Sequence, residues 1–212
     1  MGTARPTRLT AQQITDTALQ LIDAHGLTGL TMRRLGAELG VEAMAIYRHF
    51  SGKEVLLQAV AARFGATLRS RMPTGVRGWD KVRHLARTLR QGLLDHPNLV
   101  PLLFDRPALF TAEWLESLDV QLSAYREAGL GAAASVQAYR TLGAYVLGYV
   151  TVELQFRRNP YHPEDAGPVL ALLASGRFAT LQDALPHLAA DWDEVFELGL
   201  DTVITGIQAQ LT

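Results

Sequence analysis

The sequence reads TMRRLGAELGVEAMAIYRHFSGKEVLL over residues 31–57, and this stretch decides the fold. Thr31 can N-cap a short helix with apolar residues on one side, and Gly40 can adopt the left-handed conformation that ends it. A second short helix follows, with Ile46 and Phe50 directed inward at helical spacing. Two short helices joined by a tight turn are typical of a helix-turn-helix unit, which places its second helix in the major groove of DNA.

The segments on either side of this unit carry helix-start signals. A Thr-x-x-Gln capping box at Thr10 begins an amphipathic helix over residues 10–26, and a Ser-x-x-Glu box is predicted to begin a long helix over residues 51–71, which Pro73 ends. Glu42 precedes the second short helix, where its carboxylate could cap that helix or accept a hydrogen bond from a cytosine amine. We favour the cap.

The rest of the chain also has helical periodicity. None of its segments shows the alternation of a strand, so the expected fold class is all-α. Further helices are predicted over residues 79–95, 98–104, 111–128, 132–157 and 191–210, with shorter ones near 168–175 and 180–189. The predicted domains are a helix-turn-helix domain over residues 1–57, with a connecting helix over 52–71, and a larger helical domain over 72–212.

Composition excludes several classes of function. The 212 residues include 48% hydrophobic ones, enough for a sizeable core, and no cysteine, which removes disulfides, thiolate metal sites and thiol nucleophiles. The longest apolar run, Leu142–Val152, is shorter than the roughly 20 residues that cross a bilayer. The sequence has no His-Glu-x-x-His, Gly-x-Ser-x-Gly or phosphate-binding glycine motif. We therefore expect a cytoplasmic protein that is not an enzyme and has no metal or cofactor.

Charge is distributed unevenly along the chain, although the formal net charge is −1. Residues 1–77 hold ten Lys/Arg and five Asp/Glu, whereas residues 78–212 hold ten and sixteen. The basic half is the half with the helix-turn-helix pattern. This asymmetry suits a module that contacts phosphates while the remainder of the chain stays off DNA.

The order of these motifs resembles the TetR (tetracycline repressor) family of bacterial transcriptional regulators. The resemblance is specific over residues 9–64, through GLTGLTMRRLGAELGV, the Ile-Tyr-x-His-Phe run and the Ser-Gly-Lys-Glu run. More loosely, residues 96–107, 122–130 and 142–153 resemble the ligand-binding half of the tetracycline-repressor branch. The resemblance implies a homodimer that binds a palindromic DNA operator as a repressor and is released from it by a small molecule.

The resemblance also assigns the DNA-binding positions, which are Thr31, Arg33, Ala43, Met44, Ala45, Tyr47, Arg48, His49 and Lys53. At the base-contacting positions, alanine and methionine can only press on thymine methyl groups, whereas Arg48 can bond guanine O6 and N7. Lys53 and the free amides of a helix start suit a phosphate. Two alternatives stay open, because Tyr47 could brace the two short helices and His49 could be a core histidine.

A regulator of this kind responds to an effector molecule, and the candidate residues for binding that molecule are aromatic and polar residues of the carboxyl-terminal half. They are His84, Phe104, Arg106, Phe110, Trp114, Gln121, Tyr139, Arg140 and Glu153. Aromatic residues at helical spacing are usually core, whereas a buried charge needs a partner or a ligand. In the tetracycline repressor a histidine helps to hold a metal-chelated drug. Leu102 stands at the matching place here, so a more apolar or aromatic effector is expected.

The last two long helices are predicted to form a two-fold homodimer. Their apolar residues recur at steps of three and four, and antiparallel helices of this kind form a four-helix bundle when two chains each give a pair. The predicted contact residues are Val136, Gly143, Val146, Val150, Trp192, Phe196, Gly199, Val203 and Ile207. The alternative is that both stripes fill the core of a single chain.

Two other functions remain as alternatives. A helical protein-interaction adaptor would use the helix-turn-helix pattern only for packing and would have no use for the positive charges of Arg33, Arg48 and Lys53. A constitutive DNA binder would lack a small-molecule effector. A salt titration of duplex binding identifies a DNA regulator, because counterion release makes its affinity fall steeply with salt.

Overall fold

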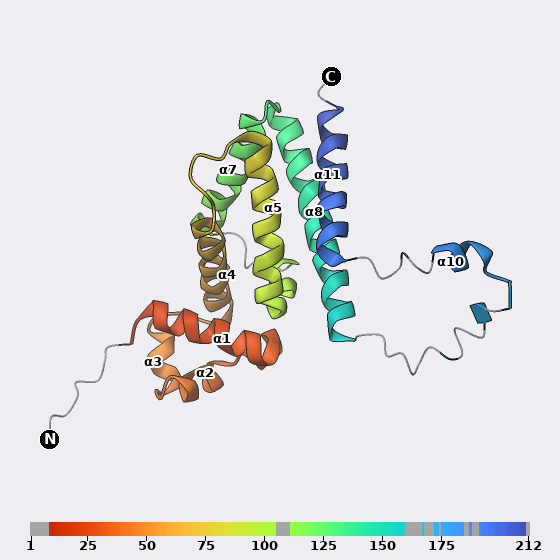
Figure 1. Cartoon of the computed structure of the whole chain (residues 1–212). Helices are drawn as coiled ribbons and strands as arrows, with labels where there is room; N and C mark the ends of the chain where they lie inside the picture. Colours follow the sequence, from red (N-terminus) through yellow and green to blue (C-terminus); the bar gives the residue numbers. More distant parts are fainter. Residues whose placement is uncertain are drawn as a thin grey trace. The chain divides into compact units, whose positions relative to one another are not determined.

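The computed structural model describes residues 9–104, 111–159, 167, 172–173, 175–184, 187 and 191–210. These residues form helices and no strand, which confirms the all-α prediction. The elements are α1 (Ala11–Gly29), α2 (Met32–Glu38), α3 (Ala43–Tyr47), α4 (Lys53–Ser70), α5 (Gly78–Asp95), the 3-10 helix η1 (Pro97–Phe104), α7 (Ala112–Glu127), α8 (Ala132–Arg158), α10 (Ala179–Ala184) and α11 (Trp192–Gln208) (Figure 1). The chain forms two compact units, residues 1–139 and 140–212. The short helix predicted near 168–175 lies mostly outside the described residues.

Helix α1 begins as the sequence predicts. The Thr10 hydroxyl accepts a hydrogen bond from the Gln13 amide at 3.2 Å, and the Gln13 side chain accepts one from the Thr10 amide at 3.0 Å. Both halves of the capping box are therefore present. The helix is interrupted at Gly26, where φ is 72°, and its last turn ends at Gly29.

The α2–turn–α3 unit is held by a cap, a left-handed glycine and a close backbone approach. The Thr31 hydroxyl accepts from the Arg34 amide at 3.1 Å, and Gly40 has a φ of 66°. A Cβ at Gly36 would lie 2.8 Å from the carbonyl oxygen of Val41, so only glycine lets the turn approach α2 so closely. The cap and the left-handed residue were predicted, whereas the close approach was not.

Two predicted helix caps are wrong. Helix α4 begins at Lys53, so Gly52 rather than Ser51 takes the N-cap position, and no side chain caps this helix. The Ser-x-x-Glu pattern is one residue out of register with the true helix start. Glu42 does precede α3, but its carboxylate makes no capping hydrogen bond. Glutamate is not among the shorter side chains that favour this position.

Within the first unit, α1 packs against α4 and η1, and α5 packs against α7. The Asn98 side-chain amide donates to the carbonyl oxygens of Ile22 at 3.0 Å and Asp23 at 2.9 Å. His96 Nδ1 lies 2.9 Å from Asp23 Oδ2. These contacts, which we call the α1–η1 joint, tie the first helix to the segment that follows α5.

In the second unit, the part of α8 from residue 140 onward and α11 lie side by side and are joined by aromatic residues (Figure 1). The hydroxyl groups of Tyr145 and Tyr149 donate to the carbonyl oxygens of Phe196 and Trp192 at 2.7 Å and 2.6 Å. The rings of Tyr145 and Phe196 stack with 5.7 Å between their centroids. Gly199 leaves space for Tyr145, because a Cβ there would clash with the phenol ring.

Candidate nucleic-acid interface

Helix α3 presents one face to solvent. Ile46 has no exposed surface, whereas Met44 is 66% exposed and Tyr47 is 43% exposed. Successive residues of an α-helix are about 100° apart, which puts Met44 and Arg48 about 160° from the buried Ile46. The outer face of α3 therefore consists of Met44 and Arg48, with Ala45 and Tyr47 on its flanks.

Polar side chains are exposed at the start of α2 and at the end of α3. Arg33, Arg48 and His49 are all exposed, so the alternative that His49 is a core histidine is wrong. Thr31 is exposed as well, but its hydroxyl is already used to cap α2. Guanidinium and imidazole groups in this arrangement can donate hydrogen bonds to phosphates or to base edges. The exposure of Tyr47 is compatible with both of its predicted roles.

Lys53 has a structural contact that the sequence did not indicate. Its Nζ donates to the carbonyl oxygen of Leu27 at 3.0 Å, near the end of α1. The contact joins residues 26 positions apart, and nothing in the local pattern signals it. An ammonium group carries three donors, so this bond leaves capacity for a phosphate.

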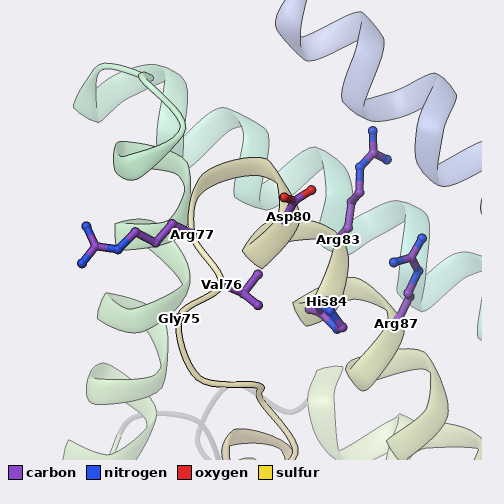
Figure 2. A pocket seen from close by; sticks show the side chains of 7 residues that line it. All are labelled: Gly75, Val76, Arg77, Asp80, Arg83, His84 and Arg87. Atoms are coloured by element: carbon purple, nitrogen blue, oxygen red, sulfur yellow. The ribbon is translucent and has the colours of Figure 1, made fainter.

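A cavity of about 520 Å³ lies where the segment before α5 meets the first turns of that helix (Figure 2). The residues that line it are Gly75, Val76, Arg77, Asp80, Arg83, His84 and Arg87. Its guanidinium groups can donate hydrogen bonds to an anionic or hydroxylated molecule. Arg83 and Arg87 also interact with other groups of the protein. The lining is more polar than the apolar or aromatic site that the sequence suggested, and His84 is the predicted effector residue that it contains.

The remaining predicted effector residues are not gathered in this cavity. Three of them are half-buried: Trp114, Gln121 and Tyr139. Burial raises the pKa of the Tyr139 hydroxyl above its ordinary value, which keeps this group a neutral donor. Two are exposed: Phe104 and Arg140. Two lie outside the described residues: Arg106 and Phe110.

Glu153 is the predicted effector residue with the most buried charge. It has no exposed surface, and its Oε1 accepts from Arg157 Nε at 3.0 Å and Nη2 at 2.8 Å. The buried carboxylate therefore has a protein partner. Burial of this charge alone gives no reason to expect a ligand beside it.

The predicted dimer residues fall into two groups. Val146, Val150 and Phe196 are buried in the single chain, and Gly199 packs against Tyr145. Val146, Val150 and Phe196 therefore favour the alternative that the apolar stripes fill the core of a single chain, because a side chain without exposed surface cannot contact a second chain. Val136 is exposed, and the others are half-buried: Gly143, Trp192, Val203 and Ile207. Val136 and the half-buried residues keep exposed surface, so their role in a dimer stays a prediction.

The described part of the chain contains no group of three or more His, Cys, Asp or Glu residues that could hold a metal ion. None of its helices is both long enough and apolar enough to cross a membrane.

A second helix with an exposed outer face, followed by the exposed Arg48 and His49 and held by a capped first helix and a glycine turn, defines a DNA-binding regulator of the helix-turn-helix class. Residues 14–60 match the family model of bacterial regulatory proteins of the tetR family, and residues 73–211 match that of the tetracyclin repressor-like C-terminal domain. The chain belongs to the TetR family of transcriptional regulators. The predicted family is thereby confirmed, and it is a family of DNA-binding proteins rather than of enzymes.

Individual relatives extend the likeness along the whole chain. An HTH-type transcriptional regulator of Saccharopolyspora erythraea is 30% identical over 207 residues, which cover 95% of this chain and 85% of that protein. The HTH-type transcriptional repressor DrrR1 of Streptomyces coeruleorubidus is 30% identical over 215 residues, covering 96% and 78%. The structure of Streptomyces coelicolor ActR in complex with actinorhodin has a TM-score of 0.77 and 27% identity, covering 96% of this chain and 99% of that one.

Proposed function

We propose that this protein is a repressor whose homodimer binds a palindromic operator and leaves it when a small hydrophobic or aromatic molecule binds. Residues 1–57 contact DNA in this proposal, and residues 72–212 hold the effector and the second subunit. The observation that carries the proposal is the outer face of α3, which presents Met44 and Arg48 to solvent while Ile46 anchors the helix. A protein of this function works in the cytoplasm, where the bacterial chromosome lies.

The DNA-binding part is tested by selecting duplexes from a random pool with the full-length protein. The expected product is a motif with dyad symmetry whose half-sites are about 34–36 Å apart, because two identical helices must enter successive major grooves. Affinity for that motif should fall steeply with salt. An asymmetric motif contradicts the dimeric arrangement, and failure to bind any duplex supports the adaptor instead.

The homodimer is supported by a surface on the second unit that the chain itself leaves exposed. Ala144, Gly148 and Val152 recur every four residues on α8, and Val195, Leu198 and Thr202 follow at steps of three and four on α11; all six are exposed. Small residues on α8 permit close approach between backbones, and exposed apolar residues of this kind favour association. The partner is a second copy, because a palindromic operator requires two identical DNA-binding units.

Replacing Leu198 tests this surface. Leu198 is 69% exposed, and Leu115 on α7 is a matched control at 58%. The expected result is that Leu198→Asp yields monomers by light scattering at concentrations where the wild type and Leu115→Asp are dimers. Neither change removes a buried contact, so thermal unfolding should show that both variants fold. A dimer that persists in Leu198→Asp refutes the assignment of this face.

Two observations support the part of the proposal that concerns an effector: the α1–η1 joint and one similar protein. ActR forms a complex with actinorhodin, which supports a small-molecule effector for this chain. The joint offers a route, because a shift of residues 96–98 would carry α1 with it through the contacts of His96 and Asn98. Effector and operator would then oppose each other with a coupling of about 1–3 kcal/mol, equivalent to about 5–150-fold in affinity.

The experiment measures operator affinity by fluorescence anisotropy across a panel of aromatic compounds. A compound that weakens operator binding of the wild type should weaken that of Asn98→Ala less, because the variant loses the two bonds that hold α1 to η1. If no compound changes operator affinity, the protein is a constitutive DNA binder. If Asn98→Ala responds as fully as the wild type, the joint is not the route.

A further inference from the structure

We propose that Met44 recognises the 5-methyl group of thymine in each operator half-site, and that 5-methylcytosine at the same position can replace thymine. The inference rests on the proposed DNA-binding function and names the chemical group on the operator that α3 selects. It concerns one side chain, which is 66% exposed at the centre of the outer face of α3.

The two residues adjacent to Met44 in the chain offer no hydrogen bonds to bases from their side chains. Ala43 and Ala45 flank it on the same short helix, and both are partly exposed. Arg48, four residues further on, is the strong side-chain donor of the outer face. The amino-terminal half of this face is therefore apolar, whereas its carboxyl-terminal half is cationic.

An apolar side chain in the major groove still discriminates between base pairs. It gains contact with the methyl group of thymine, which no unmodified base other than thymine presents there. It also removes water from the polar edges of guanine, adenine or cytosine without replacing the lost hydrogen bonds, which disfavours those bases. Methionine suits this role because its thioether is flexible and polarisable and can adapt to the position of the methyl group.

This mode of recognition differs from hydrogen-bond recognition in its response to chemical modification of the base. Uracil has the same hydrogen-bonding edge as thymine and lacks only the methyl group. Cytosine has a different edge, but 5-methylcytosine carries a methyl group at the equivalent carbon. Met44 should therefore distinguish thymine from uracil and should distinguish 5-methylcytosine from cytosine.

The expected size of the effect follows from the burial of one methyl group. Removing one such contact should weaken binding about fourfold, and removing the symmetrical pair in a dimer should weaken it about 15-fold. The experiment uses the full-length protein and the duplex obtained by selection, and fluorescence anisotropy is the readout. Each thymine of a half-site is replaced in turn by deoxyuridine, together with its symmetry mate.

For the wild type, we expect that replacing thymine by deoxyuridine weakens binding by this factor at one position of the half-site, or at two adjacent positions. Met44→Ala should bind the thymine and uracil duplexes equally, whereas Arg48→Ala should bind both more weakly and keep the ratio between them. At the sensitive position, 5-methylcytosine should bind about 15-fold more tightly than cytosine in the wild type and equally in Met44→Ala.

Three outcomes overturn the inference. The first is a half-site in which no thymine is sensitive to loss of its methyl group, and the second is a thymine preference that Met44→Ala retains in full. The third is equal binding of cytosine and 5-methylcytosine by the wild type. In each of these the protein still binds its selected duplex, so the proposed DNA-binding function stands. A wild type that binds no duplex overturns both.

Discussion

Lys53→Met separates two roles that the structure allows for this lysine. The Nζ donates to the Leu27 carbonyl at 3.0 Å, which supports α1, and the proposed operator complex gives the same group a phosphate. Methionine keeps the length of the aliphatic side chain and removes both the charge and the donor. If both roles exist, the substitution lowers stability and also lowers the salt dependence of DNA binding.

The two magnitudes can be worked out separately. A hydrogen bond from a charged donor contributes about 1.5 kcal/mol, which corresponds to a fall in Tm of about 3–6 °C for a chain of this size. Each phosphate contact contributes about 0.9 to the slope of log affinity against log salt, so the two lysines of a dimer contribute about 1.8. Between 50 and 200 mM salt, the wild type should then lose about 12-fold more affinity than the variant.

The assay is fluorescence anisotropy with operator and scrambled duplexes at several salt concentrations, with thermal unfolding measured in parallel. Lys81→Met is the matched control, because Lys81 Nζ also donates a hydrogen bond, here to the Glu127 carboxylate at 3.2 Å, and lies on α5. The control should change stability without changing the salt slope. An unchanged slope in Lys53→Met, together with a lowered Tm, refutes the phosphate contact and leaves Lys53 a purely structural role.

Three further outcomes are expected. Arg48→Ala should relax the preference for one G·C pair per half-site by about 1–3 kcal/mol in a randomised-operator selection, whereas equal losses at every sequence would contradict a base contact. Ile46→Ala should destabilise the protein by about 2–4 kcal/mol in chemical denaturation, and the exposed Met44→Ala by less than about 0.5; equal effects would mean that Ile46 does not anchor α3. The hydrogen bond from Gln91, together with that from Arg71, holds the pKa of Asp95 below its ordinary value. The ionised Asp95 therefore contributes stability that is present above pH 3.8 and is lost as the pH falls further. Asp95→Asn should therefore lose less stability on acidification than the wild type, and parallel acid-unfolding curves would refute this.

The parts of the fold that the sequence predicted depend on interactions between residues close together in the chain. The Thr10 capping box, the Thr31 cap and the left-handed Gly40 each involve groups within four residues, so their pattern is visible locally. The one-residue shift at the start of α4 shows the limit of such patterns. A Ser-x-x-Glu motif can occur beside a helix without starting it, because the packing of the helix also sets where it begins.

The parts of the site that the sequence missed depend on tertiary contacts. Lys53 contacts Leu27, which is 26 residues away in the chain, and His96 contacts Asp23, which is 73 residues away. The periodicity of a sequence does not indicate such pairs. The prediction of dimer-contact residues shows a related limit. A stripe of apolar residues identifies a helix that packs against something, but it does not distinguish the inward side from a side of small and apolar residues that stays exposed.

The contact at Gly36 makes the approach of α3 to DNA sensitive to a single methyl group. The hydrogen at this position lets the Val41 carbonyl sit against α2, so alanine would have to push the turn outward by several tenths of an ångström. This displacement would reorient α3 relative to α1 without changing any of the side chains that are predicted to contact bases. Gly36→Ala should therefore retain every predicted DNA-binding residue and still misalign these residues with the groove.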